Sequence, residues 1–378
     1  MLSGSVWPAI LVVGAVGGVA AQGPGGRLVD GVRIVDNVAR RSAPIAFTLA
    51  AKPTLDLGGL KASPDDEFSP NGGYLNGVRL SDGRWAVIDE SRIRFFNPGG
   101  RQLAVVGRKG GGPSEFQQIT GICRTRGDTL VVNDPINGRV TVVAPNARIV
   151  RSVAVGRADL PWGGGCFDDG TFVLVTAAPS VGGDRYMQLV RRRLDGKTTQ
   201  TLGPFWQSTP DRFLPSFSTV VAQGTKLFLS DPRVHEVRVY TAEGTLTHRI
   251  RSADPIEELT SAEKMALTPA VSPRAGNSAA NKAYNADQDR LAPRPPLWPT
   301  TASIAVDPTG RLWVESFRKR RTEPHIYTAF DTAGKLLGRL ILPADSPAIA
   351  FTAGGVLLWR TDKDGADHLV VYELVAPR

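Results

Sequence analysis

A short hairpin unit recurs along this chain, and its spacing constrains the fold more than any other feature of the sequence. The unit is a glycine-containing turn followed by an apolar strand that ends in an acidic residue, as in residues 82–89 and 127–134. Most successive units begin about 44 residues apart, the length that one four-stranded blade needs. The glycines that mark the units are Gly83, Gly127, Gly170, Gly224, Gly310 and Gly354. We therefore predict an all-β chain built as a β-propeller of four-stranded antiparallel blades.

The marker glycines predict six blades, although the interval between Gly224 and Gly310 is long enough for two. Residues 254–300, inside that interval, contain no alternating apolar run and no Asp-Gly turn, which argues against a further blade. Residues 255–267 favour a short helix, and prolines recur between Pro293 and Pro299. We interpret residues 254–300 as a helical and proline-rich insertion between blades four and five.

The two ends of the chain indicate how the ring closes. The last repeat, residues 348–374, supplies three strands, and residues 53–57 can form a further strand before the first full blade. Pairing that N-terminal strand with the last blade would close the ring and cover two exposed edges. The predicted organisation is a propeller over residues 53–378 after an N-terminal segment over residues 22–52, in which residues 37–49 are a candidate for backing structure.

The first 21 residues indicate export. They carry no charged side chain, residues 7–19 are apolar and small, and Val19-Ala20-Ala21 precedes Gln22 as a small-residue cleavage site. We predict a signal peptide over residues 1–21 and a periplasmic or secreted protein with no integral membrane domain after cleavage. Retention of the apolar run as an anchor is the alternative, which is less favoured because the run is short and rich in glycine for a membrane span.

The two cysteines, Cys123 and Cys166, fall on the predicted innermost strands of consecutive blades. An exported protein can form a disulfide, whereas two small buried thiols would also suit neighbouring inner strands. The sequence leaves both alternatives open.

The formal net charge is +9, and basic residues cluster at residues 191–193 and 318–321. Such runs can meet nucleic acid, anionic lipid or acidic polysaccharide. Export argues against nucleic acid as a partner. We interpret the runs as solvated charges that keep edge strands from pairing, with a specific anionic ligand as the alternative.

Candidate binding residues come from the loops that propellers commonly use for ligands. The glycine-rich stretch 107–116 looks like a phosphate cradle, but Pro113 and the lack of a following helix favour a crossover between blades. Acidic residues at strand ends suit the holding of turns. Tryptophans beside crossovers either line a surface for sugar or peptide or fill gaps between blades. The candidate ligand-binding residues are Arg79, Arg108, Lys109, Glu115, Arg124, Asp134, Trp162, Asp231 and Trp298.

Signals for catalysis and metal binding are weaker. The chain has no Gly-x-Ser-x-Gly, no His-Glu-x-x-His and no cysteine pair at metal spacing. His235, His325 and His368 open the third strands of different predicted blades, which places them far apart for a shared zinc ion. We therefore identify no catalytic residue, and we predict no metal ligand and no cofactor.

Several stretches resemble the bacterial six-bladed β-propellers related to NHL-repeat proteins, many of which are exported. The resemblance rests on residues 107–116, on the paired Asp134 and Asp231, and on residues 304–314 after the insertion. It implies a fold rather than an activity, because the shared motifs are structural. Some relatives of this architecture are lactonases, strictosidine-synthase-like enzymes or amidating lyases that hold a metal at the axis. Where such proteins need polar ligands, the inner strands of this chain have Cys123, Cys166, Ala305 and Ala350.

We expect an exported, monomeric binding or scaffold protein that recognises a protein or carbohydrate partner through its loop face and the 254–300 insertion. The alternative is a metal-dependent hydrolase or lyase, similar to a lactonase, with calcium or another divalent ion at the propeller axis. An enzyme is the less favoured of the two. Its axial polar groups would be Arg79, Glu115, Arg124, Asp134 and Asp231.

Overall fold

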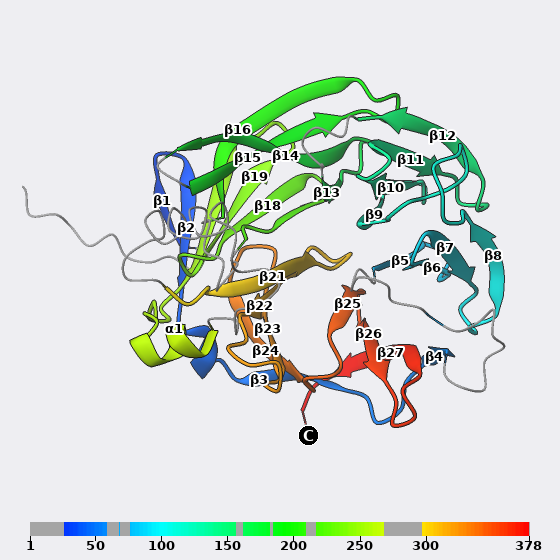
Figure 1. Cartoon of the computed structure of the whole chain (residues 1–378). Coiled ribbons are helices and arrows are strands. Elements are labelled where there is room, and N and C mark those ends of the chain that lie inside the picture. Colours follow the sequence, from blue (N-terminus) through cyan, green and yellow to red (C-terminus); the bar gives the residue numbers. More distant parts are fainter. Residues whose placement is uncertain are drawn as a thin grey trace, which may run out of the picture.

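The protein has a β-propeller fold, in which antiparallel sheets are arranged around a common centre (Figure 1). The computed structural model describes residues 26–58, 68, 76–155, 162–181, 184–208, 217–267 and 297–377 of the 378-residue chain. The predicted signal peptide, residues 1–21, lies outside the described residues, as does most of the 254–300 segment.

Strands pair into four-stranded antiparallel units that run from an innermost to an outermost strand. The first three units are β5 (Gly77–Arg79), β6 (Trp85–Asp89), β7 (Arg92–Phe96) and β8 (Gln102–Val106); β9 (Gly121–Arg124), β10 (Leu130–Asp134), β11 (Arg139–Val143) and β12 (Ile149–Ala154); and β13 (Trp162–Cys166), β14 (Phe172–Val181), β15 (Asp184–Arg192) and β16 (Thr198–Ser208).

The units that follow are β17 (Val220–Gln223), β18 (Lys226–Asp231), β19 (Glu236–Thr241) and β20 (Leu246–Ser252); β21 (Thr301–Val306), β22 (Leu312–Ser316), β23 (His325–Phe330) and β24 (Leu336–Leu342); and β25 (Ala348–Phe351), β26 (Gly355–Thr361), β27 (Asp367–Val375) and β4 (Leu55–Gly58). Each innermost strand contacts the innermost strand of the next unit, and β25 contacts β5, so the units form a closed circle.

Burial explains why the middle strands have such apolar sequences. All five residues of β6 and of β10 are buried, because neighbouring sheets cover both of their faces. The outer strand β12 has a mostly exposed pattern instead. The recurring glycines occupy the turns between first and second strands, and Gly83 and Gly127 have φ values of 88° and 79°. Such positive φ values favour glycine, which explains the repeat marker.

The hydrophobic core is divided among the interfaces between adjacent sheets. One cluster joins β6 and β7 to β9 and β10 through side chains such as Ile88, Phe95 and Val132. Another joins β18 and β19 to β21 and β22 through Phe228, Val239 and Val314. Stability therefore depends on contacts between neighbouring sheets all round the ring.

The N-terminal part of the chain, which we call the N-terminal strap (residues 32–58), runs along the outside of three units. β2 (Val32–Asn37) pairs parallel with β20, and β1 (Arg27–Val29) pairs with β2. The 3-10 helix η1 (Arg40–Ser42) then leads to β3 (Ile45–Leu49), which pairs parallel with β24 and also meets β27. β4 pairs antiparallel with β27, where the sequence places the closing strand.

Two further features bear on the sequence-based predictions. Cys123 on β9 and Cys166 on β13 form a disulfide with Cα atoms 5.6 Å apart, so the first of the two cysteine alternatives holds. A short helix, α1 (Ser261–Leu267), lies within the stretch where the sequence predicts one. No helix in the described part of the chain is long and apolar enough to span a membrane.

Candidate functional site

The predicted binding residues divide between two opposite edges of the ring. Arg79 ends β5 and Arg124 ends β9, beside the turns that lead into the second strands. Arg124 pairs with Leu130 at the start of β10, whereas Asp134 stands at the far end of β10. The edge that carries Asp134 also carries the turns between second and third strands and the crossovers between units. We call this edge the loop face. Arg79 and Arg124 therefore do not join the other candidates, which corrects their grouping at one axial site.

Asp134 organises a crossover. Its carboxylate is fully buried and accepts hydrogen bonds from the backbone N–H groups of Gln117 (2.9 Å), Gln118 (3.2 Å) and Asn137 (3.2 Å). The side-chain amide of Asn137 donates a fourth at 2.7 Å. These contacts leave the carboxylate occupied by the protein itself, which agrees with the turn-holding role predicted for acidic strand ends.

Glu115 has a similar role in the glycine-rich loop. Its carboxylate accepts hydrogen bonds from the N–H of Gly112 at 2.7 Å and from Nε of Arg108 at 2.9 Å, and these contacts lower its pKa. Arg139 of β11 donates to the carbonyl oxygens of Gly112 and Glu115. Arg108 and Lys109 extend into solvent. The loop is a crossover between two units, as the sequence favours.

Two other candidates are also accounted for. Asp231 forms a two-pronged ion pair with Arg233, with Nε–Oδ1 at 2.9 Å and Nη2–Oδ2 at 2.7 Å, and the guanidinium lies 4.2 Å from the ring centre of Trp206. Trp162 begins β13, and its side chain lies outside the described residues. The Asp231 carboxylate, at the end of β18, is thus engaged by Arg233 of the turn that follows.

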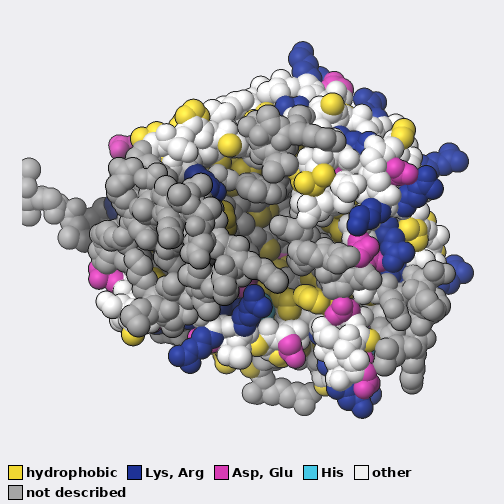
Figure 2. Space-filling model, viewed as in Figure 1, with side chains coloured by type: hydrophobic (Ala, Val, Ile, Leu, Met, Phe, Trp, Pro, Cys, Tyr) yellow, Lys and Arg dark blue, Asp and Glu magenta, His cyan; other side chains and the backbone are white. Residues whose placement is uncertain are grey.

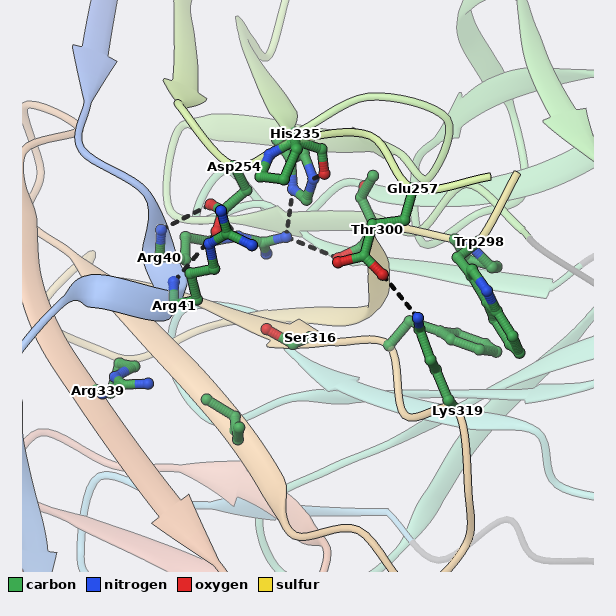
Figure 3. Close-up of a pocket in the computed structure, with 14 residues that line it drawn as sticks. Arg40, Arg41, His235, Asp254, Glu257, Trp298, Thr300, Ser316, Lys319 and Arg339 are labelled. Atoms are coloured by element: carbon green, nitrogen blue, oxygen red, sulfur yellow. Dashed lines mark hydrogen bonds and ion pairs between the residues drawn. The ribbon is translucent and has the colours of Figure 1, made fainter. Parts of the chain in front are cut away.

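Trp298 leads to a cavity of about 210 Å³ on the loop face, between the β17–β20 and β21–β24 units (Figure 3). The described ends of the 254–300 segment meet here, because Trp298 donates its backbone N–H to the carbonyl of Glu257 at 2.9 Å. The cavity is lined by Arg40, Arg41, His235, Asp254, Pro255, Glu257, Trp298, Pro299, Thr300, Ser316, Phe317, Lys319, Ile326 and Arg339.

One wall of the cavity is built around Arg40, which is only 5% exposed. Its guanidinium donates to the carbonyl of Thr300 at 2.7 Å and lies 2.8 Å from Nδ1 of His235. The carboxylate of Asp254 accepts the backbone N–H groups of Arg40 (2.6 Å) and Arg41 (3.2 Å). These bonds fix η1, and with it both arginines, against the end of β20.

Burial and charge set the ionisation states on this wall. Burial lowers the pKa of Arg40 to about 10, despite the nearby Asp254, so its guanidinium stays protonated at neutral pH. Burial and the Arg40 charge lower the pKa of His235, so its ring is neutral there. Burial alone would raise the pKa of Asp254, but the hydrogen bonds from Arg40 and Arg41 outweigh it and keep the carboxyl ionised.

The opposite wall contains an ion pair and an aromatic cluster. Nζ of Lys319 lies 2.6 Å from Oε2 of Glu257 and 4.8 Å from the ring centre of Trp298. Trp298 is only 6% exposed and packs against Phe317 and Leu259. The Trp298 side chain is therefore mostly packed against its apolar neighbours, and it also contributes to the lining of the cavity.

Two cations of the cavity have no carboxylate partner in the described residues. Figure 3 shows Arg339 of β24 at one side of the cavity, away from Lys319. Its guanidinium forms no hydrogen bond or ion pair with the described residues, and its Nε atom is buried. The Arg41 side chain likewise forms no ion pair within the described ranges. Four cationic side chains thus face two carboxylates, both already engaged, which leaves a surplus of two positive charges.

The other basic residues are dispersed. Figure 2 shows Lys and Arg side chains at several places around the rim. Within the run at residues 191–193, Arg191 forms ion pairs with Asp169 and Glu243, and Arg193 pairs with Asp195. In the run at 318–321, Lys319 faces the cavity. Arg191, on β15 between β14 and β16, is thus locally paired and mostly buried, which differs from the solvated edge charge that the sequence favours.

The three histidines proposed at strand starts lie in separate surroundings. His325 places Nδ1 2.6 Å from Oε1 of Glu315, and His368 places Nδ1 2.7 Å from Oδ1 of Asp56. His235 belongs to the cavity. No group of three or more His, Cys, Asp or Glu side chains within the described ranges is placed to hold a metal ion.

The sequence-based candidates omit Arg40, Arg41 and Arg339, which supply three of the four cations of the cavity. Arg40 and Arg41 are adjacent in the N-terminal strap, whereas Arg339 follows about 300 residues later on β24. The pairing of β3 with β24 is what brings them to one site. The signals in the sequence are Trp298 and the basic run that contains Lys319.

Comparisons with known proteins describe the fold. No model of a protein family matches the chain, and no curated protein sequence matches it. Among solved structures, it is similar to a candidate exported protein from Bacteroides fragilis (TM-score 0.53, 11% identity, covering 91% of this chain and 99% of that one). It is also similar to a member of the DUF4221 family from Bacteroides vulgatus (TM-score 0.50, 10% identity, 88% and 99%) and to a streptogramin B lyase (0.45, 9%, 89% and 94%). At these identities the likeness is one of fold alone.

Proposed function

We propose that this chain is an exported six-bladed β-propeller, related to the NHL-repeat proteins, that binds a protein or carbohydrate partner at its loop face. The strand pairings support a count of six, since they group the strands of the described residues into six four-stranded units whose innermost strands form a circle. The residue composition of 1–21 supports export through a cleaved signal peptide.

The observation that carries the binding proposal is the cavity between the β17–β20 and β21–β24 units. It opens on the loop face, at the base of the 254–300 insertion, and combines cationic, acidic and apolar side chains. Convergence of a few polar groups with apolar walls in a concave site is typical of ligand recognition. The other candidate residues on the loop face, Asp134, Glu115 and Asp231, are engaged in holding loops.

The proposal is tested by applying the purified mature protein, expected to be a monomer, to arrays of defined glycans and peptides. Lys319→Ala should weaken retention of any bound component, because Lys319 lines the cavity. The matched control is Arg126→Ala, which changes an exposed basic residue in the turn between β9 and β10, at the edge opposite the loop face. Equal retention of both variants would contradict binding at the cavity.

A further inference from the structure

We propose that the cavity between the β17–β20 and β21–β24 units binds a small hydroxylated carboxylate of the hexuronic acid class, with Arg339 and Arg41 holding its carboxylate. This inference rests on the proposed function and names the ligand class of that site. The ligand is either a free uronic acid or the terminal unit of an acidic polysaccharide, since both present the same group.

The surplus charge selects an anion. Asp254 is occupied by the backbone N–H groups of η1, and Glu257 is paired with Lys319, so neither carboxylate neutralises Arg339 or Arg41. A guanidinium offers several N–H donors in a plane that matches a carboxylate, and charge-assisted bonds of this type are strong. Arg339 lines the cavity, and its buried Nε has no hydrogen-bond partner among the described residues, so the protein itself does not neutralise this guanidinium through that atom.

The two acidic side chains select against a ligand that is only an anion. Asp254 and Glu257 keep acceptor capacity beyond their contacts with η1 and Lys319, because an ionised carboxylate has about four lone-pair sites, so they favour ligand groups that donate hydrogen bonds. The hydroxyl groups of a sugar acid are such donors. Ser316 adds a hydroxyl to the lining. Cationic and acidic groups in one small site therefore match a molecule with one carboxylate and several hydroxyls.

Size and shape favour a single sugar unit over a peptide. About 210 Å³ is room for about seven water molecules at about 30 Å³ each, and it is below the range of drug-sized ligands. Walls from η1, β22 and β24 bound the space on several sides, whereas an extended peptide needs a groove or a free strand edge. Phe317, Ile326 and Pro299 provide apolar surface for the C–H side of a sugar ring.

The test is calorimetric titration of the full mature protein with sodium galacturonate, with galactose and acetate as partial probes. We expect galacturonate to bind at least about tenfold more tightly than either, because only galacturonate meets both kinds of group. Arg339→Gln and Arg41→Gln should each weaken galacturonate at least about tenfold. Arg126→Gln should not change its affinity. Arg41 is exposed and on the strap, so its variant keeps the test valid even if Arg339→Gln fails to fold.

The remaining probes separate the sources and the failures. A galacturonate trimer that binds more tightly than the monomer identifies a polysaccharide end, and equal affinity identifies the free acid. The inference would be overturned if galactose bound as tightly as galacturonate. It would also be overturned if a folded Arg41→Gln variant bound galacturonate with unchanged affinity. Capture of an acidic peptide that Lys319→Ala releases, without galacturonate binding, would also overturn it while leaving the proposed function intact. If the protein binds neither galacturonate nor any partner that Lys319→Ala releases, both this inference and the proposed function are overturned.

Discussion

At the scale of single residues, Asp134 shows how a charged side chain at a strand end holds two sheets in place. It is buried, and its four hydrogen-bond donors all belong to the crossover from β8 to β9 or to the turn after β10. The carboxylate therefore replaces the water that these donors would otherwise need.

Asp134→Ala should destabilise the protein by about 3 kcal/mol, because it leaves several buried N–H groups without an acceptor. Urea unfolding followed by tryptophan fluorescence measures this loss. Asp82→Ala is the matched control, since Asp82 also accepts a backbone N–H but is exposed, and it should cost less than about 1 kcal/mol. Similar losses in both variants would show that burial of Asp134 is not the cause.

A second residue-scale prediction concerns pH. Burial alone would lower the pKa of His368, but hydrogen bonds with Asp56 and Asp362 outweigh it and raise the pKa above its ordinary value. The pairing therefore stabilises the folded protein fully below about pH 6.5, the pKa of an unfolded histidine, and this contribution disappears as pH rises through the raised pKa.

Unfolding free energies measured from pH 5.5 to 9 should show this loss in the wild type, and His368→Gln should reduce it. Because Asp56 lies on β4 and His368 on β27, the effect reports on the pair of strands that closes the ring. A variant with the same pH dependence as the wild type would exclude His368 as its source.

At the scale of elements, the disulfide between β9 and β13 connects two neighbouring units across 43 residues of chain. Closing a loop of that length in the unfolded state corresponds to a stabilisation of about 4 kcal/mol in the chain-entropy treatment. The Cys123→Ser, Cys166→Ser double variant should lose up to that amount in urea unfolding. Reduction of the wild type should give the same loss and leave the variant unaffected; a variant as stable as the oxidised protein would contradict the prediction.

Several elements were predictable from the sequence because their signals are local. The turn glycines need positive φ at Gly83 and Gly127, and apolar runs such as residues 85–88 need burial on both faces, so both appear as repeats. The closing strand and the short helix at Ser261–Leu267 also carry local signals. The positions of β2 and β3 do not, because parallel pairing with β20 and β24 depends on strands about 200 and 300 residues away.

The candidate site was predictable only in part for the same reason. Trp298 and the run containing Lys319 stand out in the sequence, but their neighbours Arg40 and Arg339 are ordinary basic residues until the strap pairs with β24. Conversely, Arg124 looks suitable for an axial site, yet it is placed at the opposite edge, where it donates to Asp128 at 2.8 Å. This edge follows from the order of strands within the unit, because Arg124 ends β9 beside the turn that contains Gly127.

At the scale of the whole molecule, the binding proposal and its enzymatic alternative differ in their dependence on a metal. For the binding protein we expect elemental analysis of the purified protein to find less than one divalent ion per chain. Its melting temperature should be the same with and without a chelator. A bound ion would stabilise the folded state, and without one the chelator has nothing to remove. One tightly held calcium or other divalent ion per chain, with a melting temperature that falls on chelation, would instead support a metal-dependent hydrolase or lyase.

The N-terminal strap also imposes an order on folding. Asp56 and His368, which meet where the ring closes, are 312 residues apart in the chain. β2, β3 and β4 leave the ribosome early, yet each pairs with a strand synthesised much later. Contacts over such separations form slowly, because the entropy of the intervening chain is lost before they are made. In a nascent chain β4 would thus stay unpaired until β27 is complete, so closure of the ring is the last step of folding.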